Sequence, residues 1–120
     1  MGRRTWEFHQ EEDEHGGVRI LSLKGRLDGA SAPMLQRAFA HLAPGAVLVD
    51  FSGLDYISGP GLAAVRDAAG RAADASKPFV VCGLEGSVHI AFELAGLLTT
   101  LVVEPDRIRG LARIAGSRKV

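Results

Sequence analysis

The sequence has 120 residues, and its 14 lysines and arginines balance its 14 aspartates and glutamates, giving a formal net charge of zero. Hydrophobic residues make up 47% of the chain, which predicts one globular domain over residues 1–120, with frayed ends at 1–4 and 116–120. Without surplus positive charge, nucleic acid is not an expected partner. No apolar run approaches the ~20 residues that span a bilayer.

The start of the chain is basic but lacks the apolar core of a secretory leader. Cys82 is the single cysteine, so no internal disulfide is possible. These two observations together predict a cytoplasmic protein that is not inserted in a membrane.

The first half of the chain predicts an edge hairpin, then a helix, a buried strand and a second helix. Residues 5–10 alternate like a strand, with Trp6 and Phe8 on one face, and 11–17 form a charged connection that ends in two glycines. A second strand is expected over 18–24. Ser31 is the expected N-cap of a helix with Pro33 in its first turn, and 46–51 reads as a strand covered on both faces. The apolar stripes of the two helices are Leu35, Ala38, Phe39 and Leu42, then Leu62, Val65, Ala69 and Ala72.

The second half predicts strands over 79–82 and 99–103, with a helix between them and another after Pro105. The third helix has more apolar side chains than one core stripe needs. Either the core covers them all, or Ile90, Leu94 and Leu97 form an exposed docking ridge. The last helix is expected to turn Ile108, Leu111, Ala112 and Ala115 inward. The order ββαβαβαβα predicts an α/β fold with a mostly parallel central sheet and an antiparallel hairpin at one edge.

Residues with catalytic chemistry are sparse. The four histidines lack paired ligand spacing, Cys82 has no C-x-x-C partner, and no serine lies in a G-x-S-x-G turn. We therefore expect no metal, no cofactor and no enzymatic activity, while a small enzyme or ligand-binding protein stays the remote alternative.

The most informative segment runs from Val49 to Leu62, where a buried strand leads through a polar link to Ser58 at the start of a helix. A hydroxyl at this position caps free backbone N–H groups or carries a phosphate, which the helix dipole favours. Asp28 and Asp50 each follow an apolar strand, so both are expected at strand ends, on the same side of the sheet as Ser58. An equally good interpretation has each carboxylate capping a local turn.

Three segments together resemble the STAS domains and, within them, the bacterial anti-sigma factor antagonists. Residues 23–28, Leu-Lys-Gly-Arg-Leu-Asp, are similar to the family's strand-ending G-x-L-D. Asp50-Phe51-Ser52 closes an apolar strand in the same way, and residues 56–62 resemble the I-D-S-S-G-L or I-S-S-A-G-L loop. The resemblance covers nearly the whole chain.

The resemblance implies a regulatory binding module. Such antagonists dock onto an anti-sigma factor that is also a serine-protein kinase, of the histidine-kinase-like ATPase type, and so free a sigma factor. The kinase phosphorylates a loop serine and abolishes docking. Other STAS domains belong to stressosome-like scaffolds or to lipid and anion transport complexes, which is the alternative for this chain.

The loop departs from the family pattern at the serine. Counting back from Leu62, Gly59 and Pro60 fall where the family's two serines stand, so Ser58 is the one candidate phosphoacceptor in the loop. Either Ser58 substitutes for the family serine, or the chain is not switched by phosphorylation. The expected partner-binding residues are Asp28, Asp50, Asp55, Tyr56, Ile57, Ser58, Gly59, Pro60, Gly61 and Leu94.

Overall fold

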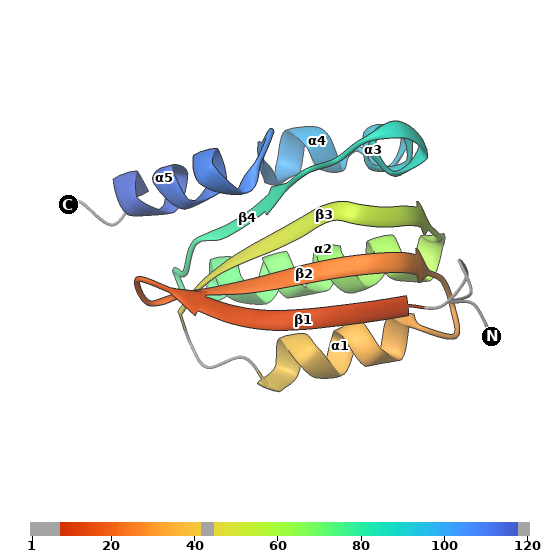
Figure 1. Cartoon of the computed structure of the whole chain (residues 1–120), viewed down its shortest axis with the longest axis horizontal. Coiled ribbons are helices and arrows are strands. Elements are labelled where there is room, and N and C mark those ends of the chain that lie inside the picture. The colour runs from red at the N-terminus through yellow and green to blue at the C-terminus, as the bar shows by residue number, and fades with distance from the viewer. Residues whose placement is uncertain (1–7, 42–44, 118–120) are drawn as a thin grey trace.

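A five-stranded sheet in the order β1-β2-β3-β4-β5 organises the fold (Figure 1). The computed structural model describes residues 8–41 and 45–117. β1 pairs with β2 antiparallel and the other neighbours pair parallel, which confirms the predicted α/β class with a hairpin at one edge. The elements are β1 Phe8–His15, β2 Val18–Leu27, α1 Ala32–His41, β3 Ala46–Ile57, α2 Gly59–Asp74, β4 Phe79–Cys82, α3 Gly86–Leu94, α4 Leu97–Thr100, β5 Val102–Glu104 and α5 Arg107–Ser117.

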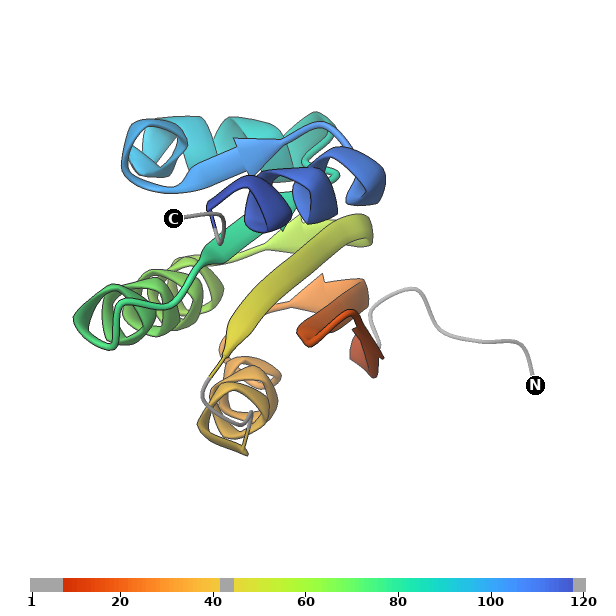
Figure 2. The same ribbon diagram turned by 90° about the vertical axis from the view of Figure 1, so that its left-hand side faces the viewer.

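The two faces of the sheet are covered unequally (Figure 2). Alternate β3 residues Val49 and Phe51 belong to the larger core, which α1, α2, α3 and α4 complete. Leu48 points to the other face, where a smaller core is closed by Ile114 of α5. Among the described elements α5 is the one that covers this face of the sheet, while α1 and α2 lie on the opposite face.

The charged run after the first strand is itself strand. We predicted a connection over 11–17, but Glu11 to His15 pair with β2, and Gly16 and Gly17, with φ of 58° and 82°, make the turn. The prediction was wrong because β1 is an edge strand, where charged side chains stay solvated while the backbone pairs. Trp6 and the expected frayed ends at 1–4 and 118–120 lie outside the described residues.

Both central strands are longer than predicted. β2 continues past Gly25, whose φ is 90°, to Leu27, and β3 continues past Phe51 to Ile57. The polar link expected after Phe51 is thus strand, paired with the end of β2 across two register shifts. In the helix stripes, Leu35, Ala38 and Phe39 are buried as expected, as is Val65, and Leu62, Ala69 and Ala72 pack partly buried against the core; Leu42 lies outside the described residues.

The last helix is rotated from the phase predicted. Gly110 and Ile114 face the core, and Leu111 packs partly buried against it as predicted, whereas Ile108 is 80% exposed and Ala112 and Ala115 are exposed. The reason is close packing at Gly110, where an added Cβ would come within 2.6 Å of Leu48 Cδ1.

Three further differences lie near the C-terminus. Thr99 and Thr100, predicted in a strand, form the short helix α4. Leu97, predicted as a member of an exposed ridge, is only 3% exposed because α4 turns it into the larger core. Gly116 and Ser117, expected in a frayed tail, are helical. Within the described ranges, no helix is both long and apolar enough to cross a membrane.

Candidate functional site

The carboxyl ends of β2 and β3 meet at one edge of the sheet, which we call the carboxyl edge: residues 28–31 and 55–61 together with the first turn of α3. The Ser58 N–H donates to the Leu27 carbonyl oxygen at 2.9 Å, so the two strand ends are joined directly. A Cβ built on Gly29 would lie 4.0 Å from Pro60 Cγ, which places the turn after β2 beside the start of α2.

The Asp28 turn is a closed local network. Asp28 Oδ1 accepts the N–H of Ala30 at 3.0 Å and of Ser31 at 3.1 Å. The Ser31 hydroxyl accepts the Asp28 N–H at 2.9 Å and donates to the Arg26 carbonyl oxygen at 2.9 Å, so the side chain closes this turn. Ser31 directly precedes α1, as predicted, and its carbonyl oxygen accepts the Leu35 N–H at 3.4 Å. The Ser31 N–H and hydroxyl, aided by Ala30 and Arg26, hold the pKa of Asp28 below its ordinary value. Asp28 is thus an ionised turn residue next to the loop, as the local alternative predicted.

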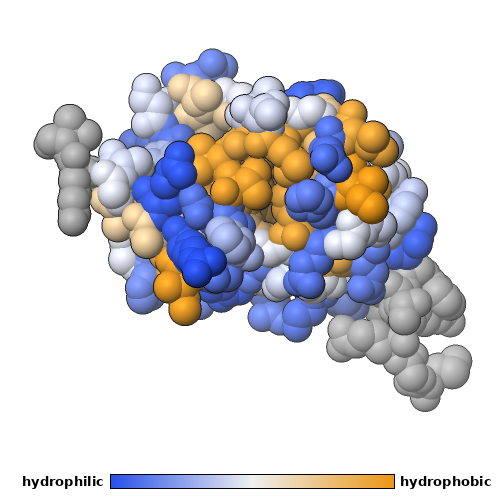
Figure 3. Space-filling view, turned by 90° about the horizontal axis from the view of Figure 1, so that it is seen from above, coloured by the Kyte–Doolittle hydropathy of each residue, from blue (hydrophilic) through white to orange (hydrophobic). Residues whose placement is uncertain are grey.

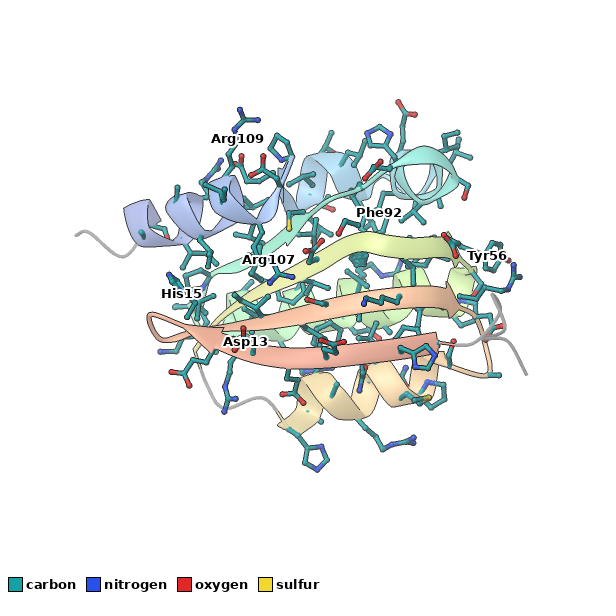
Figure 4. The ribbon with its side chains drawn as sticks, in the orientation of Figure 1. Asp13, His15, Tyr56, Phe92, Arg107 and Arg109 are labelled. Carbon is teal, nitrogen blue, oxygen red and sulfur yellow. The ribbon has the colours of Figure 1, made fainter. Side chains whose placement is uncertain are left out.

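Tyr56 lies at the outer end of β3 (Figure 4), next to the exposed Asp55. The Arg26 guanidinium carbon lies 3.9 Å from the Tyr56 ring centroid, a cation–π contact between neighbouring strands. The Ser87 hydroxyl donates to the Asp55 carbonyl oxygen at 3.1 Å, which ties the first turn of α3 to the end of β3. Neither Arg26 nor Ser87 was singled out in the sequence. The alternation of side chains along β2 could have identified Arg26 as a residue on one face of that strand. No local pattern could have identified Ser87, because its partner Asp55 is 32 residues away in the sequence.

Ser58 occupies the N-cap position of α2 with an extended backbone, but its hydroxyl makes no capping hydrogen bond. The Oγ atom is buried and has no hydrogen-bond partner among the described residues. The predicted capping bond is therefore wrong. Pro60 lies in the first turn of α2, where its missing N–H costs no helical hydrogen bond.

Gly61 lets the start of α2 pack closely against the ends of β2 and β3. A Cβ there would meet Leu27 Cγ and Ile57 Cγ1 at 2.9 Å and the Leu27 carbonyl oxygen at 3.0 Å. Gly59, in contrast, has no atom within 4 Å of its Cβ position. Of the predicted loop contacts, Asp55, Gly59 and Pro60 are exposed and Tyr56 is partly exposed, while Ile57 and Gly61 are buried and support the loop from below.

The outer side of α3 carries two exposed apolar side chains one turn apart, Ile90 at 54% and Leu94 at 83% exposure, which we call the α3 ridge. The inner side of α3 packs through Val88 and Phe92. The Phe92 and Phe51 rings are in edge-to-face contact, with their centroids 5.1 Å apart. Figure 3 shows hydrophobic side chains gathered on the face formed by α3, α4 and α5, interrupted by hydrophilic ones. The predicted exposure is confirmed for Ile90 and Leu94, and their docking role stays a prediction.

Asp50 does not belong to the carboxyl edge, contrary to the prediction. It lies in the interior of β3 and faces α5, because β3 is six residues longer than its predicted end at Phe51. Its Oδ2 accepts from Arg107 Nη2 at 2.9 Å and Nε at 3.2 Å, and Arg107 Nη2 also donates to Ser22 Oγ at 2.7 Å. Burial acts to raise the pKa of Asp50, but hydrogen bonds from Ser52 and Arg107 outweigh it and keep the pKa lowered.

Two observations bear on metal and thiol chemistry. Residues 8–41 and 45–117 contain no group of three histidine, cysteine, aspartate or glutamate side chains that could hold a metal ion. Cys82 is fully buried beside Asp50, and burial raises the pKa of its thiol to about 12, so it is not a thiolate at neutral pH. The geometry suits a docking surface: a rigid polar loop beside an apolar ridge.

Comparison with known proteins finds one family match and one related curated sequence. The family described as "Mlab, STAS domain" matches residues 11–104. BtrV of Bordetella bronchiseptica, whose name assigns it as an anti-sigma factor antagonist, is 31% identical over 98 residues, which cover 79% of this chain and 84% of BtrV.

Solved structures of low sequence identity share the fold. An anti-sigma factor antagonist from Mycobacterium paratuberculosis is 22% identical with a TM-score of 0.82, covering 91% of this chain and 95% of that one. The antagonist SpoIIAA in its unphosphorylated form is 12% identical with a TM-score of 0.68, covering 95% of this chain and 100% of that one. A sulfate transporter family protein from Wolinella succinogenes is 15% identical with a TM-score of 0.77, covering 88% and 91%. The family match and the relative above 30% identity show that this chain belongs to the STAS domain family, as its motifs indicated.

Proposed function

We propose that this chain is an anti-sigma factor antagonist that docks onto an anti-sigma factor and so frees a sigma factor, with no catalytic step of its own. The name of BtrV supports this assignment. The observation that carries it is the α3 ridge, whose two large apolar side chains lie exposed on the helix that Ser87 ties to the loop. Exposed apolar side chains grouped beside a rigid polar rim are typical of interaction sites.

The carboxyl edge is preorganised for docking. The Asp28 turn, the Arg26–Tyr56 contact and the Ser87–Asp55 hydrogen bond fix the loop from three sides. A rigid surface loses little conformational entropy on binding. Covering Leu94, which is 83% exposed, would stabilise a complex by about 1.5–3 kcal/mol.

The partner in this proposal is a serine-protein kinase of the histidine-kinase-like ATPase type. Its support is the family resemblance of the loop over residues 56–62. We infer that docking is not switched at Ser58, because its Oγ is buried and Pro60 stiffens the loop that a kinase would have to bind. Docking is then set by the abundance of the chain.

The Ser58 inference is tested by incubating the chain with the kinase and ATP and mapping the product by mass spectrometry. We expect no phosphate at Ser58, and Ser58→Ala should bind the kinase as wild type does. A phosphopeptide that contains modified Ser58, together with loss of binding in Ser58→Asp, would show that this hydroxyl is the switch after all.

Docking itself is tested by titration calorimetry with a kinase-type anti-sigma factor from the same genome. Leu94→Lys should lose binding without a change in melting temperature, because a charge replaces an exposed apolar contact. Ile108→Lys is the matched control, since Ile108 is equally exposed, at 80%, but lies on α5. Equal binding by both variants would remove the α3 ridge from the interface.

A second candidate function is a STAS subunit of a stressosome-like scaffold or of a lipid or anion transport complex. The observation that favours it is the pair Gly59 and Pro60 where the family's serines stand. A pull-down from the native organism separates the two: sigma-pathway proteins support the antagonist, and transporter subunits support the alternative.

A further inference from the structure

The segment that contains α3 has a charge pattern unlike the rest of the chain. Residues 78–106 contain no lysine or arginine, although the whole chain has 14 of them. Of the four acidic side chains in this segment, two pair with arginines of α5. The other two, Glu85 and Glu93, are exposed and have no ion-pair partner among the residues that the structure describes. The surface around α3 therefore carries negative charge that no neighbouring cation balances.

The position of Glu93 is unfavourable for the helix that carries it. Glu93 lies in the last turn of α3, where the carbonyl end of the helix dipole disfavours an anion. No basic residue lies in that turn to offset the charge. A carboxylate that opposes the dipole and lacks a cation does not stabilise α3, so its charge is available to a group outside the chain.

Carboxylates lie on both sides of the α3 ridge. Glu93 directly precedes Leu94, which places it about 100° from Leu94 around the helix axis. On the other side, Ser87 lies one turn before Ile90 and donates to the Asp55 carbonyl oxygen at 3.1 Å, which brings the exposed Asp55 next to the ridge. An apolar centre with a charged rim is the usual anatomy of a protein–protein interface.

We propose that the α3 ridge enters an apolar groove of its partner whose two edges carry lysine or arginine side chains. This inference rests on the proposed docking function and adds the charge of the partner's surface. Complementary charges at the rim of an interface mainly accelerate association and repel partners of the wrong sign. The apolar contact of Leu94 mainly determines how long the complex lasts. The acidic rim and the ridge thus act on different rate constants, which makes the two contributions separable.

The test measures association with the kinase-type anti-sigma factor by stopped flow in 0.05 and 0.5 M NaCl. The wild-type association rate constant should fall about tenfold at the higher salt concentration, because salt screens the attraction between exposed charges. In low salt Glu93→Lys should associate about tenfold more slowly than wild type, with little change in the dissociation rate. Leu94→Ala should mainly raise the dissociation rate.

Two controls separate the rim from other effects. Asp67→Lys makes the same change of charge at an exposed position on α2 that also lacks an ion pair among the described residues, and it should associate within about twofold of wild type. Glu93→Lys should melt no lower than wild type, because a cation in the last turn suits the helix dipole. Slower association of this variant then cannot be caused by unfolding.

The outcomes distinguish this inference from the docking function. If association is insensitive to salt and to Glu93→Lys while Leu94→Lys still abolishes binding, the acidic rim has no role and the docking function stands. Equal slowing by Asp67→Lys would also overturn the inference, because the effect would then come from the net charge of the chain. A wild-type chain that forms no complex at either salt concentration would overturn the docking function and this inference with it.

Discussion

Two aspartates, each at the centre of a polar network, show two ways in which this fold positions charge. Asp28 is bonded within residues 26–31, at the carboxyl edge, by groups that are its neighbours in sequence. Asp50 lies on the face of the sheet that α5 covers. It accepts hydrogen bonds from Arg107, which is 57 residues away in the sequence. The first network shapes a docking loop, and the second fastens α5 to the sheet. Only the second should matter strongly for folding.

Removing Arg107 should therefore give the largest effect. Arg107→Ala leaves the Asp50 carboxylate, whose side chain is 12% exposed, without its cation, and should lower the free energy of unfolding by about 2–3 kcal/mol in urea titrations. The matched control is Arg109→Ala, which breaks an exposed pair and should cost less than about 0.5 kcal/mol. Equal losses of unfolding free energy in both variants would mean that the Asp50–Arg107 contact does not fasten α5 to the sheet.

Glycine substitutions test how closely the carboxyl edge is packed. Gly61→Ala should lower the free energy of unfolding by about 1–2 kcal/mol, because its Cβ would press on the Leu27 backbone. Gly59→Ala, with open space around it, should be close to neutral. Thermal unfolding of both variants tests whether close packing holds the loop. A Gly61→Ala variant as stable as wild type would show that it does not.

Acid should weaken both networks. The pKa values of Asp28 and Asp50 are lowered by folding, so each carboxylate stabilises the protein above its unfolded pKa of about 3.8. That contribution is lost as the pH falls below this value through the folded pKa. Asp50→Asn should flatten the melting temperature between about pH 5 and pH 2 relative to wild type. An unchanged slope would show that Asp50 gains nothing from Arg107.

The smallest expected effect concerns Cys82, which lies under the Asp50 network. Because burial raises the pKa of its thiol to about 12, the folded protein should not react with a thiol reagent at neutral pH, and unfolded protein should react fully. Reaction of the folded chain at a rate independent of denaturant would indicate that α5 opens away from the sheet.

The two networks also differ in what the sequence could reveal. The Asp28 turn was predicted as the local alternative, since its donors lie within three residues. The apolar strands and the helix stripes of α1 and α2 were predicted because buried faces impose a period. The Asp50–Arg107 pair was missed, because nothing local relates a strand residue to a helix 57 residues later.

The phase of α5 shows the limit of hydrophobic periodicity. Its strongest apolar stripe, with Ile108 and Leu111, was predicted to face the core, yet Gly110 gives the closer approach to Leu48. Steric fit at a glycine therefore overrode the pattern of hydrophobic residues. The end of β3 was also misplaced by its side chains. Ser52 and Asp55 are polar and exposed, which suggested a loop, but the backbone of this segment still pairs with β2.

The most direct test of the docking function is displacement of a sigma factor. The chain is added to a preformed complex of the kinase-type anti-sigma factor and its fluorescently labelled sigma factor, and release is followed by anisotropy. Wild type should release the sigma factor stoichiometrically, and Leu94→Lys, equally folded, should not. A sigma factor that stays bound at saturating wild-type chain, or that Leu94→Lys releases as well, would contradict the proposed function of this surface.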